Sequence, residues 1–479
     1  MSKPGSAFSQ TILYGFSIIA MKGISILMLP FIAHQLTQPA FGRLEVLSSL
    51  AVVISIIVGL GLEDTLYRFA GRAETVLERR RFAARIFGLG MVLGAVSLAI
   101  VWFLAPALSR SLPGNVSVYE LRVIMMILAL EGTIAIPMGW LRMENRARSF
   151  FTLSVSRAVI QAALTFSMLQ PGNDITPVLE ASLIAAIIQA VVLTFLQIRD
   201  TGISIRVKDE GALILYSLPI VGSGLVAFAL NGLDRWILAD QTSLVEVAEY
   251  GIASKFALAA VLLLQPFGMW WSPKRFEITS QLNGKEAAVK AISIGIGLCL
   301  IICVCVSTGA PILINWLIPA SYIMASKYAL GLVLAMTLRE LSELVNIGCY
   351  INRSTLSQLW INISTTLVGL LIMLVTVSSM GVWGVIIALI SAQSLRLILF
   401  YLVSQYFFRL DYPLLAIALL GLQTLCWLAF STQFESVTQQ LVYAVVAAAM
   451  ISISAVTLKL IPLSATGGMQ RLKTRLAQW

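Results

Sequence analysis

Cationic side chains inside long apolar stretches are the residues of this sequence best placed to do chemistry. Four such cations are spread along the chain, namely Lys22, Arg157, Arg235 and Lys255. A charge at membrane depth is costly and by default marks a pathway or a binding site. The acids in the corresponding stretches are too few to neutralise four cations. We therefore expect a wet cavity that receives an anion such as a diphosphate or an acidic sugar, since arginine grips phosphate oxygens in pairs.

Three carboxylates at similar depth are candidates for binding a coupling ion, H⁺ or Na⁺. Glu131 lies near the middle of an apolar stretch, and Glu340 and Glu343 are three residues apart in another. A spacing of three places two side chains on one helix face. Intramembrane acids commonly form proton or ion relays.

The competing interpretation is that these charges neutralise one another and have no further role. Buried ion pairs exist for structural reasons as well, although keeping them costs desolvation. The possible pairs are Glu131 with Lys22 or Arg157, and Glu340 or Glu343 with Arg339 or Arg396. Both interpretations remain open at the level of sequence.

No arrangement of residues points to an enzyme, a metal or a cofactor. The sequence has one histidine, His34, and five cysteines that all fall in apolar stretches. It also lacks a phosphate-binding loop of the G-x-x-x-x-G-K-[ST] type, so we expect no nucleotide hydrolysis. A metal site would have almost no ligands to draw on.

The composition is that of a helical membrane protein with many spans. Of the 479 residues 58% are hydrophobic and only 12% charged, whereas soluble domains have about 25% charged residues. The net charge of +10 does not indicate nucleic-acid binding. The basic residues lie in short loops between apolar stretches, where they set membrane orientation.

The apolar stretches predict about fourteen transmembrane helices, each near the roughly 20 residues that a bilayer needs. Their expected ranges are 10–34, 44–64, 84–107, 119–141, 150–170, 177–198, 212–236, 247–271, 288–311, 326–350, 356–378, 382–404, 413–430 and 439–459. Most of the 33 Lys and Arg residues fall in alternate loops, including the basic run 68–85 and the tail after Pro462. Both termini are therefore expected in the cytoplasm.

The chain contains a weak internal repeat. The segment around Tyr250-Gly251 echoes that around Phe41-Gly42, and each pair follows an apolar stretch interrupted by proline. A repeat of this kind is common in transporters. It predicts an N-terminal lobe over residues 1–205 and a related C-terminal lobe over residues 206–410. Residues 411–479 would then add two more helices and a basic cytoplasmic tail.

Three segments of the chain form a familiar set of motifs. They are GFSIIAMKGISILMLPFIAHQLTQPAFG at 15–42, Gly59-Leu-Gly-Leu, and the segment from Ser217-Leu-Pro-Ile through Asp234-Arg235-Trp-Ile-Leu to Glu249-Tyr-Gly-Ile-Ala-Ser-Lys-Phe. These motifs resemble the polysaccharide-transporter family, the Wzx-like flippases of the multidrug/oligosaccharidyl-lipid/polysaccharide exporter superfamily. The resemblance implies an all-α integral membrane fold with two pseudo-symmetric six-helix lobes that form a V-shaped cavity, plus two extra C-terminal helices. It also places Lys22, Arg157, Arg235 and Lys255 in a cationic cavity.

The function implied is a flippase for an undecaprenyl-pyrophosphate-linked oligosaccharide in the bacterial inner membrane, driven by an ion gradient. Its partners would be the lipid-linked glycan, the coupling ion, the bilayer, and a polysaccharide polymerase with its chain-length regulator. Two alternatives remain: a multidrug/cation antiporter of the same fold, and a membrane scaffold of a polysaccharide synthase complex. The two additional C-terminal helices favour the lipid-linked glycan, because the drug exporters usually have twelve.

Overall fold

The computed structural model describes residues 4–59, 61–172, 174–204, 211–351, 356–434 and 436–462, with side chains from residue 13 onward except at 212–217, 219 and 273. The described residues form helices joined by short turns, with no strand among them. The predicted all-α membrane fold is therefore confirmed. The basic tail after Pro462 lies outside the described residues.

The chain divides into two compact units, Met1–Ala248 and Glu249–Trp479, and the division falls inside α11. The first unit contains α1 (Pro4–Gln35), α2 (Gln38–Gly59), α3 (Leu62–Gly71), α4 (Val76–Ser111), α5 (Val118–Ala129), α6 (Glu131–Met143), α7 (Ala147–Met168), α8 (Thr176–Asp200), α9 (Gly211–Asn231), α10 (Leu233–Gln241) and the start of α11 (Leu244–Thr279). The second contains the rest of α11, then α12 (Gly284–Leu317), α13 (Ile323–Val345), α14 (Ile347–Ile351), α15 (Leu356–Met380), α16 (Val382–Phe407), α17 (Leu414–Phe430) and α18 (Val437–Thr457).

Thirteen helical stretches of the described chain are long and apolar enough to cross a membrane. They correspond to thirteen of the fourteen predicted spans. The remaining one, 212–236, is also helical and is covered by α9 and α10, but it is not among the thirteen.

Four predicted spans are interrupted rather than continuous. The second breaks between α2 and α3, where Gly61 takes the left-handed conformation (φ 58°) that glycine adopts without strain. The fourth breaks at Leu130. One turn later, the carbonyl of Thr133 lacks its helical hydrogen bond, because Pro137 has no N–H to donate. The seventh and tenth break at Gly232 and Asn346. Such breaks free backbone groups at membrane depth, a feature typical of transporters.

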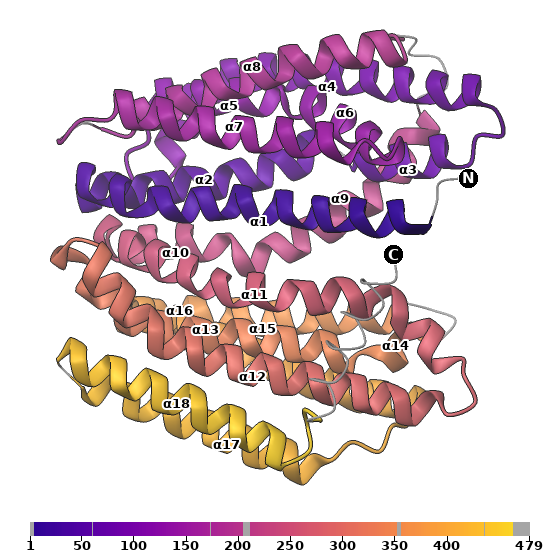
Figure 1. Cartoon of the computed structure of the whole chain (residues 1–479). Helices are drawn as coiled ribbons and strands as arrows, with labels where there is room; N and C mark the ends of the chain where they lie inside the picture. The colour runs from indigo at the N-terminus through magenta and orange to yellow at the C-terminus, as the bar shows by residue number, and fades with distance from the viewer. Residues whose placement is uncertain are drawn as a thin grey trace. The chain divides into compact units, whose positions relative to one another are not determined.

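In the first unit, α1 packs along α7, while α9 and α10 pack against α2 (Figure 1). The elements α9 and α10 belong to the predicted C-terminal lobe, yet they lie in the same compact unit as the N-terminal one. The contact with α2 accounts for this, because Gly224 approaches Ile56 closely and Ser49 Oγ donates a 2.6 Å hydrogen bond to Gly232 O.

Ion pairs tie the loops at each end of the first unit. At one end Arg79 pairs with Glu144, and Arg146 pairs with Asp200. These pairs bring together the ends of three loops that carry many of the predicted cytoplasmic charges. At the opposite end, Arg43 pairs with Glu120 and Asp174. The basic loops predicted to share one side of the membrane thus share one end of this unit.

The repeated aromatic-glycine pairs occupy similar positions. Phe41 is buried in the first turn of α2, and Tyr250 is buried in the second turn of α11. Gly42 allows a close approach, since a Cβ there would lie 1.9 Å from the carbonyl oxygen of Leu244. Gly42 is therefore required because the starts of α2 and α11 pack closely together at this point.

The second unit is built on α12, α13, α15 and α16, which pack in sequence-adjacent pairs and through α13 against α16. The two C-terminal helices, α17 and α18, both pack against α12 (Figure 1). They are the additional pair predicted from residue 411 onward.

Candidate functional site

A cavity of about 350 Å³ lies between α1 and α7 and has two of the predicted cations in its wall. Lys22 comes from the middle of α1 and Arg157 from the middle of α7. Both helices contribute to the wall because they pack side by side. The two cations are thus brought together by α1–α7 packing, although 135 positions separate them in the sequence.

Neither cation of this cavity has a salt bridge with another described residue. The Lys22 side chain is exposed and has no hydrogen bond or ion pair within the described chain. Arg157 is partly buried, and its Nη1 donates a 3.1 Å hydrogen bond to Oε1 of Gln189 on α8. Gln189 in turn donates from Nε2 to the Leu153 carbonyl oxygen at 3.2 Å. A neutral amide orients the guanidinium of Arg157 without cancelling its charge.

Hydroxyl and amide groups complete the polar portion of the wall. They come from Ser25, Ser154, Gln161 and Thr165. Ser154 is 2% exposed, and its Oγ has no hydrogen-bond partner among the described residues. The wall therefore combines two cations with neutral polar side chains.

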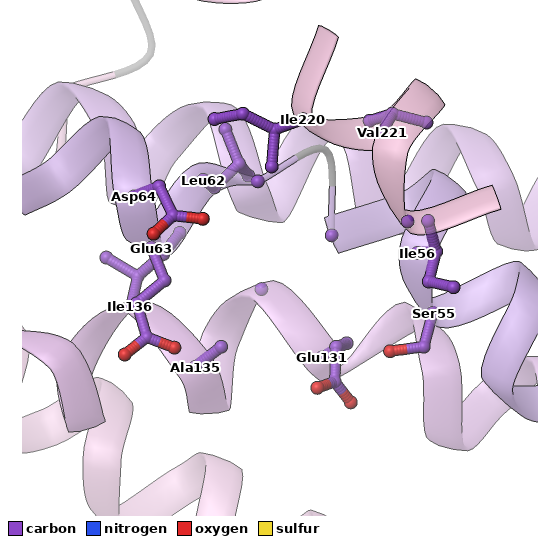
Figure 2. Close-up of a pocket in the computed structure, with 14 residues that line it drawn as sticks. Ser55, Ile56, Leu62, Glu63, Asp64, Glu131, Ala135, Ile136, Ile220 and Val221 are labelled. Carbon is purple, nitrogen blue, oxygen red and sulfur yellow. The ribbon is translucent and has the colours of Figure 1, made fainter. Parts of the chain in front are cut away.

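Glu131 lines a second cavity of the same unit, of about 280 Å³, at the break between α5 and α6. Figure 2 shows Glu131 beside Ser55 of α2, whereas Glu63 and Asp64 of α3 lie farther along the wall. Ile220 and Val221 of α9 cover another side. Three carboxylates therefore surround this cavity, in contrast to the basic cavity between α1 and α7.

Glu131 interacts electrostatically with Arg157. This is one of the pairings considered from the sequence, but no salt bridge joins these two side chains in the portion of the chain that the structure describes. Glu63 has its own partners: Arg142 Nη1 lies 2.7 Å from its Oε1, and Tyr67 Oη donates to the same oxygen at 2.5 Å.

Arg235, the third predicted cation, lies at a different place in the first unit and is neutralised there. Its Nε is 3.3 Å from Oε2 of Glu45 on α2, and its Nη1 is 3.2 Å from Oδ1 of the adjacent Asp234. Trp236 adds a 3.3 Å hydrogen bond from Nε1 to the Val46 carbonyl oxygen. Through its contact with Glu45, Arg235 holds α10 against α2 in this structure.

Lys255, the fourth cation, is a partly buried residue of α11 and belongs to the second unit. A single cavity that collects all four cations therefore remains a prediction.

The predicted coupling acids of the second unit lie in a polar network inside α13, α15 and α16. Arg396 Nη2 is 2.5 Å from Oε1 of Glu343, and its Nε donates to Oδ1 of Asn362 at 3.0 Å. Asn346 donates from Nδ2 to the second Glu343 oxygen at 2.9 Å. Glu340, the other acid, interacts electrostatically with Arg339 and Arg396. The pairing of Glu343 with Arg396 is the structural alternative considered from the sequence.

A family model described as "Polysaccharide biosynthesis protein" matches residues 8–279, more than half of the chain. The chain belongs to the polysaccharide biosynthesis protein family. The family identified from motifs in the sequence is thereby confirmed. A comparison with curated protein sequences found no match.

Solved structures confirm the transporter fold that this family is expected to have. "Lipid II flippase MurJ, inward closed conformation" matches with a TM-score of 0.71 at 13% identity, covering 93% of this chain and 98% of that chain. The MATE multidrug transporter DinF-BH, in a ligand complex, matches with a TM-score of 0.59 at 17% identity, covering 85% and 96%. A MATE structure in complex with MaL6 has a TM-score of 0.57 at 15% identity, covering 85% and 98%. At these identities the likeness concerns the fold alone.

Two residues of this family member were missed by the sequence analysis although they contact predicted site residues. Glu45 was not among the predicted site residues, and only its contact with Arg235 shows its importance. Gln189 carries no charge, and its one signal was a polar side chain in the middle of the sixth apolar stretch.

Proposed function

We propose that this chain is a flippase that moves an undecaprenyl-pyrophosphate-linked oligosaccharide across the bacterial inner membrane. The cargo would be a repeat unit of O-antigen, capsule or exopolysaccharide. The glycan and diphosphate pass through a polar route while the lipid tail stays in the bilayer. Transport proceeds by alternating access and draws on an ion gradient, with both termini in the cytoplasm. A polysaccharide polymerase and its chain-length regulator take the product onward.

The observation that carries this proposal is the basic cavity between α1 and α7. It presents an exposed Lys22 and an Arg157 whose only hydrogen-bond partner among described residues is a neutral amide. Ser25 and Gln161 add neutral polar side chains to the same wall. Arginine and lysine together suit a diphosphate, since the guanidinium binds two oxygens at once and the ammonium acts as a point charge.

The remaining predicted residues have roles in the same cycle. Arg235 and Lys255 extend the anion route beyond the first cavity, and Arg235 does so only when it leaves Glu45 and Asp234. Glu131, Glu340 and Glu343 bind the coupling ion, H⁺ or Na⁺. Because Glu343 is held by Arg396, ion binding there requires that this pair loosens.

A multidrug antiporter is the second candidate, because multidrug transporters share the fold. A cationic drug would be attracted by acidic groups and repelled by Lys22 and Arg157. The carboxylate-lined cavity at Glu131 is the feature of this chain that such a substrate would prefer.

Expression of the intact protein in two null strains tests the proposal. One strain lacks the flippase for its surface glycan, and the other lacks its drug exporters. We expect surface polysaccharide to return in the first strain and drug sensitivity to stay unchanged in the second. Restored drug resistance without polysaccharide would overturn the flippase assignment in favour of the antiporter.

A further inference from the structure

The pair α9–α10 occupies a different place in the structure from the one that the internal repeat predicts. The repeat aligns the aromatic-glycine pair of α2 with that of α11, so α9–α10 corresponds to α1, which precedes α2. The helix α1 packs along α7 of its own predicted lobe. By contrast, α9 and α10 pack against α2, which belongs to the other predicted lobe (Figure 1). In a transporter whose lobes move against each other, such a contact has to break and re-form in each cycle.

Polar contacts attach α10 and the break before it to two adjacent turns of α2. Arg235 Nε lies 3.3 Å from Oε2 of Glu45. Ser49 Oγ donates at 2.6 Å to the carbonyl oxygen of Gly232, where α9 ends and α10 begins. The side chain of Trp236 donates its hydrogen bond to α2 beside them. Because these groups are polar, water can take over their hydrogen bonds when α10 moves away from α2.

Glu45 supplies the negative charge of this contact. It is the only acidic residue in the sequence of α2, and its side chain is 6% exposed. A buried carboxylate is costly without a partner, so its charge favours the docked position of α10, in which Arg235 lies beside it. Asp234 also binds Arg235, but Asp234 belongs to α10 and moves with it. Glu45 is therefore the side chain through which α2 holds α10 by charge.

The contact lies toward the predicted outer ends of both helices. Glu45 follows the start of α2 at Gln38 by seven residues, which is about 10 Å along the helix. Arg235 precedes the end of α10 at Gln241 by six residues. The break at Gly232 lies just before this contact, and helix ends of this kind absorb the backbone rotation of hinge motions. The helix α10 can therefore swing away from α2 while α9 stays in place.

We propose that Glu45 is a positioning residue of transport, which holds α10 on α2 through Arg235 and so keeps the predicted outer side of the transporter closed. This inference rests on the alternating access that the proposed function includes. Opening begins when Arg235 leaves Glu45 and α10 turns about Gly232. The movement uncovers Ser49, which is buried beneath the break in this structure.

The exposure of position 49 measures this movement. A full-length Ser49→Cys variant in intact cells is treated with a membrane-impermeant maleimide, and the labelling of the parent chain, with its five native cysteines, is subtracted. Labelling should be slow, because the new thiol is covered while α10 is docked. Adding Glu45→Gln replaces a charge-assisted hydrogen bond by a neutral one, so the labelling rate should rise about fivefold.

Two controls separate gating from a loosened fold. Glu120→Gln makes the same change in the pair of Glu120 with Arg43, which joins α5 to α2 within one predicted lobe. It should leave the labelling rate of Ser49→Cys unchanged. Ser307→Cys places the same reporter at a fully buried position of α12, and Glu45→Gln should leave it unlabelled. The proposal is overturned if Glu45→Gln does not change labelling of Ser49→Cys, or if it raises labelling of Ser307→Cys equally.

The outcomes also distinguish this inference from the proposed function, because thiol labelling requires no glycan. Unchanged labelling by Glu45→Gln in a chain that restores surface polysaccharide would leave the flippase assignment intact and remove the gating role of Glu45. Faster labelling in a chain that restores drug resistance instead of polysaccharide would support the gate and overturn the flippase assignment.

Discussion

The contact of Arg235 with Glu45 and Asp234 gives the most quantitative prediction. The side chains of Glu45 and Asp234 are 6% and 2% exposed, and Arg235 is the cation that lies between them. Replacing Arg235 by Gln leaves two buried carboxylates without this counter-charge. Breaking a buried ion pair by removing one partner costs about 3–5 kcal/mol. Arg235→Gln should therefore lower the free energy of unfolding by about that amount.

Changing Glu45 should cost less stability than changing Arg235. Glu45→Gln keeps the Arg235–Asp234 contact at 3.2 Å and retains an amide oxygen near Nε. A neutral hydrogen bond then replaces a charge-assisted one, which should cost about 1 kcal/mol. A triple variant with Arg235→Gln, Glu45→Gln and Asp234→Asn removes all three charges of this contact, and it should be more stable than Arg235→Gln alone.

The order of stability among these variants can be measured by denaturant or thermal unfolding in detergent, followed by tryptophan fluorescence. Trp236 is one of the ten tryptophans that contribute to this signal, and its Nε1 donates to the Val46 carbonyl oxygen of α2. Arg110→Gln is the matched control, since Arg110 is exposed on α4, and it should change stability by about 0.5 kcal/mol or less. The reasoning is refuted if Arg235→Gln unfolds like the Arg110 variant, or if the triple variant is the least stable of the set.

Three further predictions concern packing, coupling and orientation. Gly42→Ala should destabilise by about 1–3 kcal/mol, because its Cβ would lie 1.9 Å from Leu244 O. The control Gly421→Ala, inside α17 with open space around the Cβ, should leave stability unchanged or raise it by up to about 1 kcal/mol in the same unfolding assay. Glu340→Gln and Glu343→Gln should each uncouple glycan export from the ion gradient at normal protein abundance, and normal export by both variants across pH and Na⁺ would make this cluster structural. Cysteine at Ala73, in the loop between α3 and α4, should react with membrane-impermeant reagents only in inside-out vesicles, whereas labelling in intact cells would reverse the orientation.

The spans and the basic loops were predictable because they depend on composition along the chain. Runs of about 20 apolar residues are unambiguous, and the fourteen predicted ranges all coincide with helices in the described chain. The interruptions at Gly61 and Leu130 were not predicted. An isolated Gly or Pro is tolerated in a membrane helix, so the residue alone does not decide between a bend and a break.

The pairing of charges was less predictable, because it depends on which helices become neighbours. A sequence separation of 190 residues divides Arg235 from Glu45, and no local pattern links them. The pair Glu343–Arg396 was among the alternatives because both lie deep in apolar spans. For Lys22 and Arg157, a shared cavity was expected from the shortage of acids and from the resemblance, and the packing of α1 on α7 brings both residues to one cavity wall.

The central claim is that the cations of the α1–α7 cavity carry the diphosphate of a lipid-linked glycan. The most direct test is complementation of a flippase-null strain, scored by surface polysaccharide with membrane protein levels checked by immunoblot. Lys22→Ala and Arg157→Ala should each abolish export, Lys22→Arg should retain part of it, and Lys22→Glu should be worse than Lys22→Ala. Full export by the Lys22→Ala/Arg157→Ala double variant at normal abundance would contradict the account.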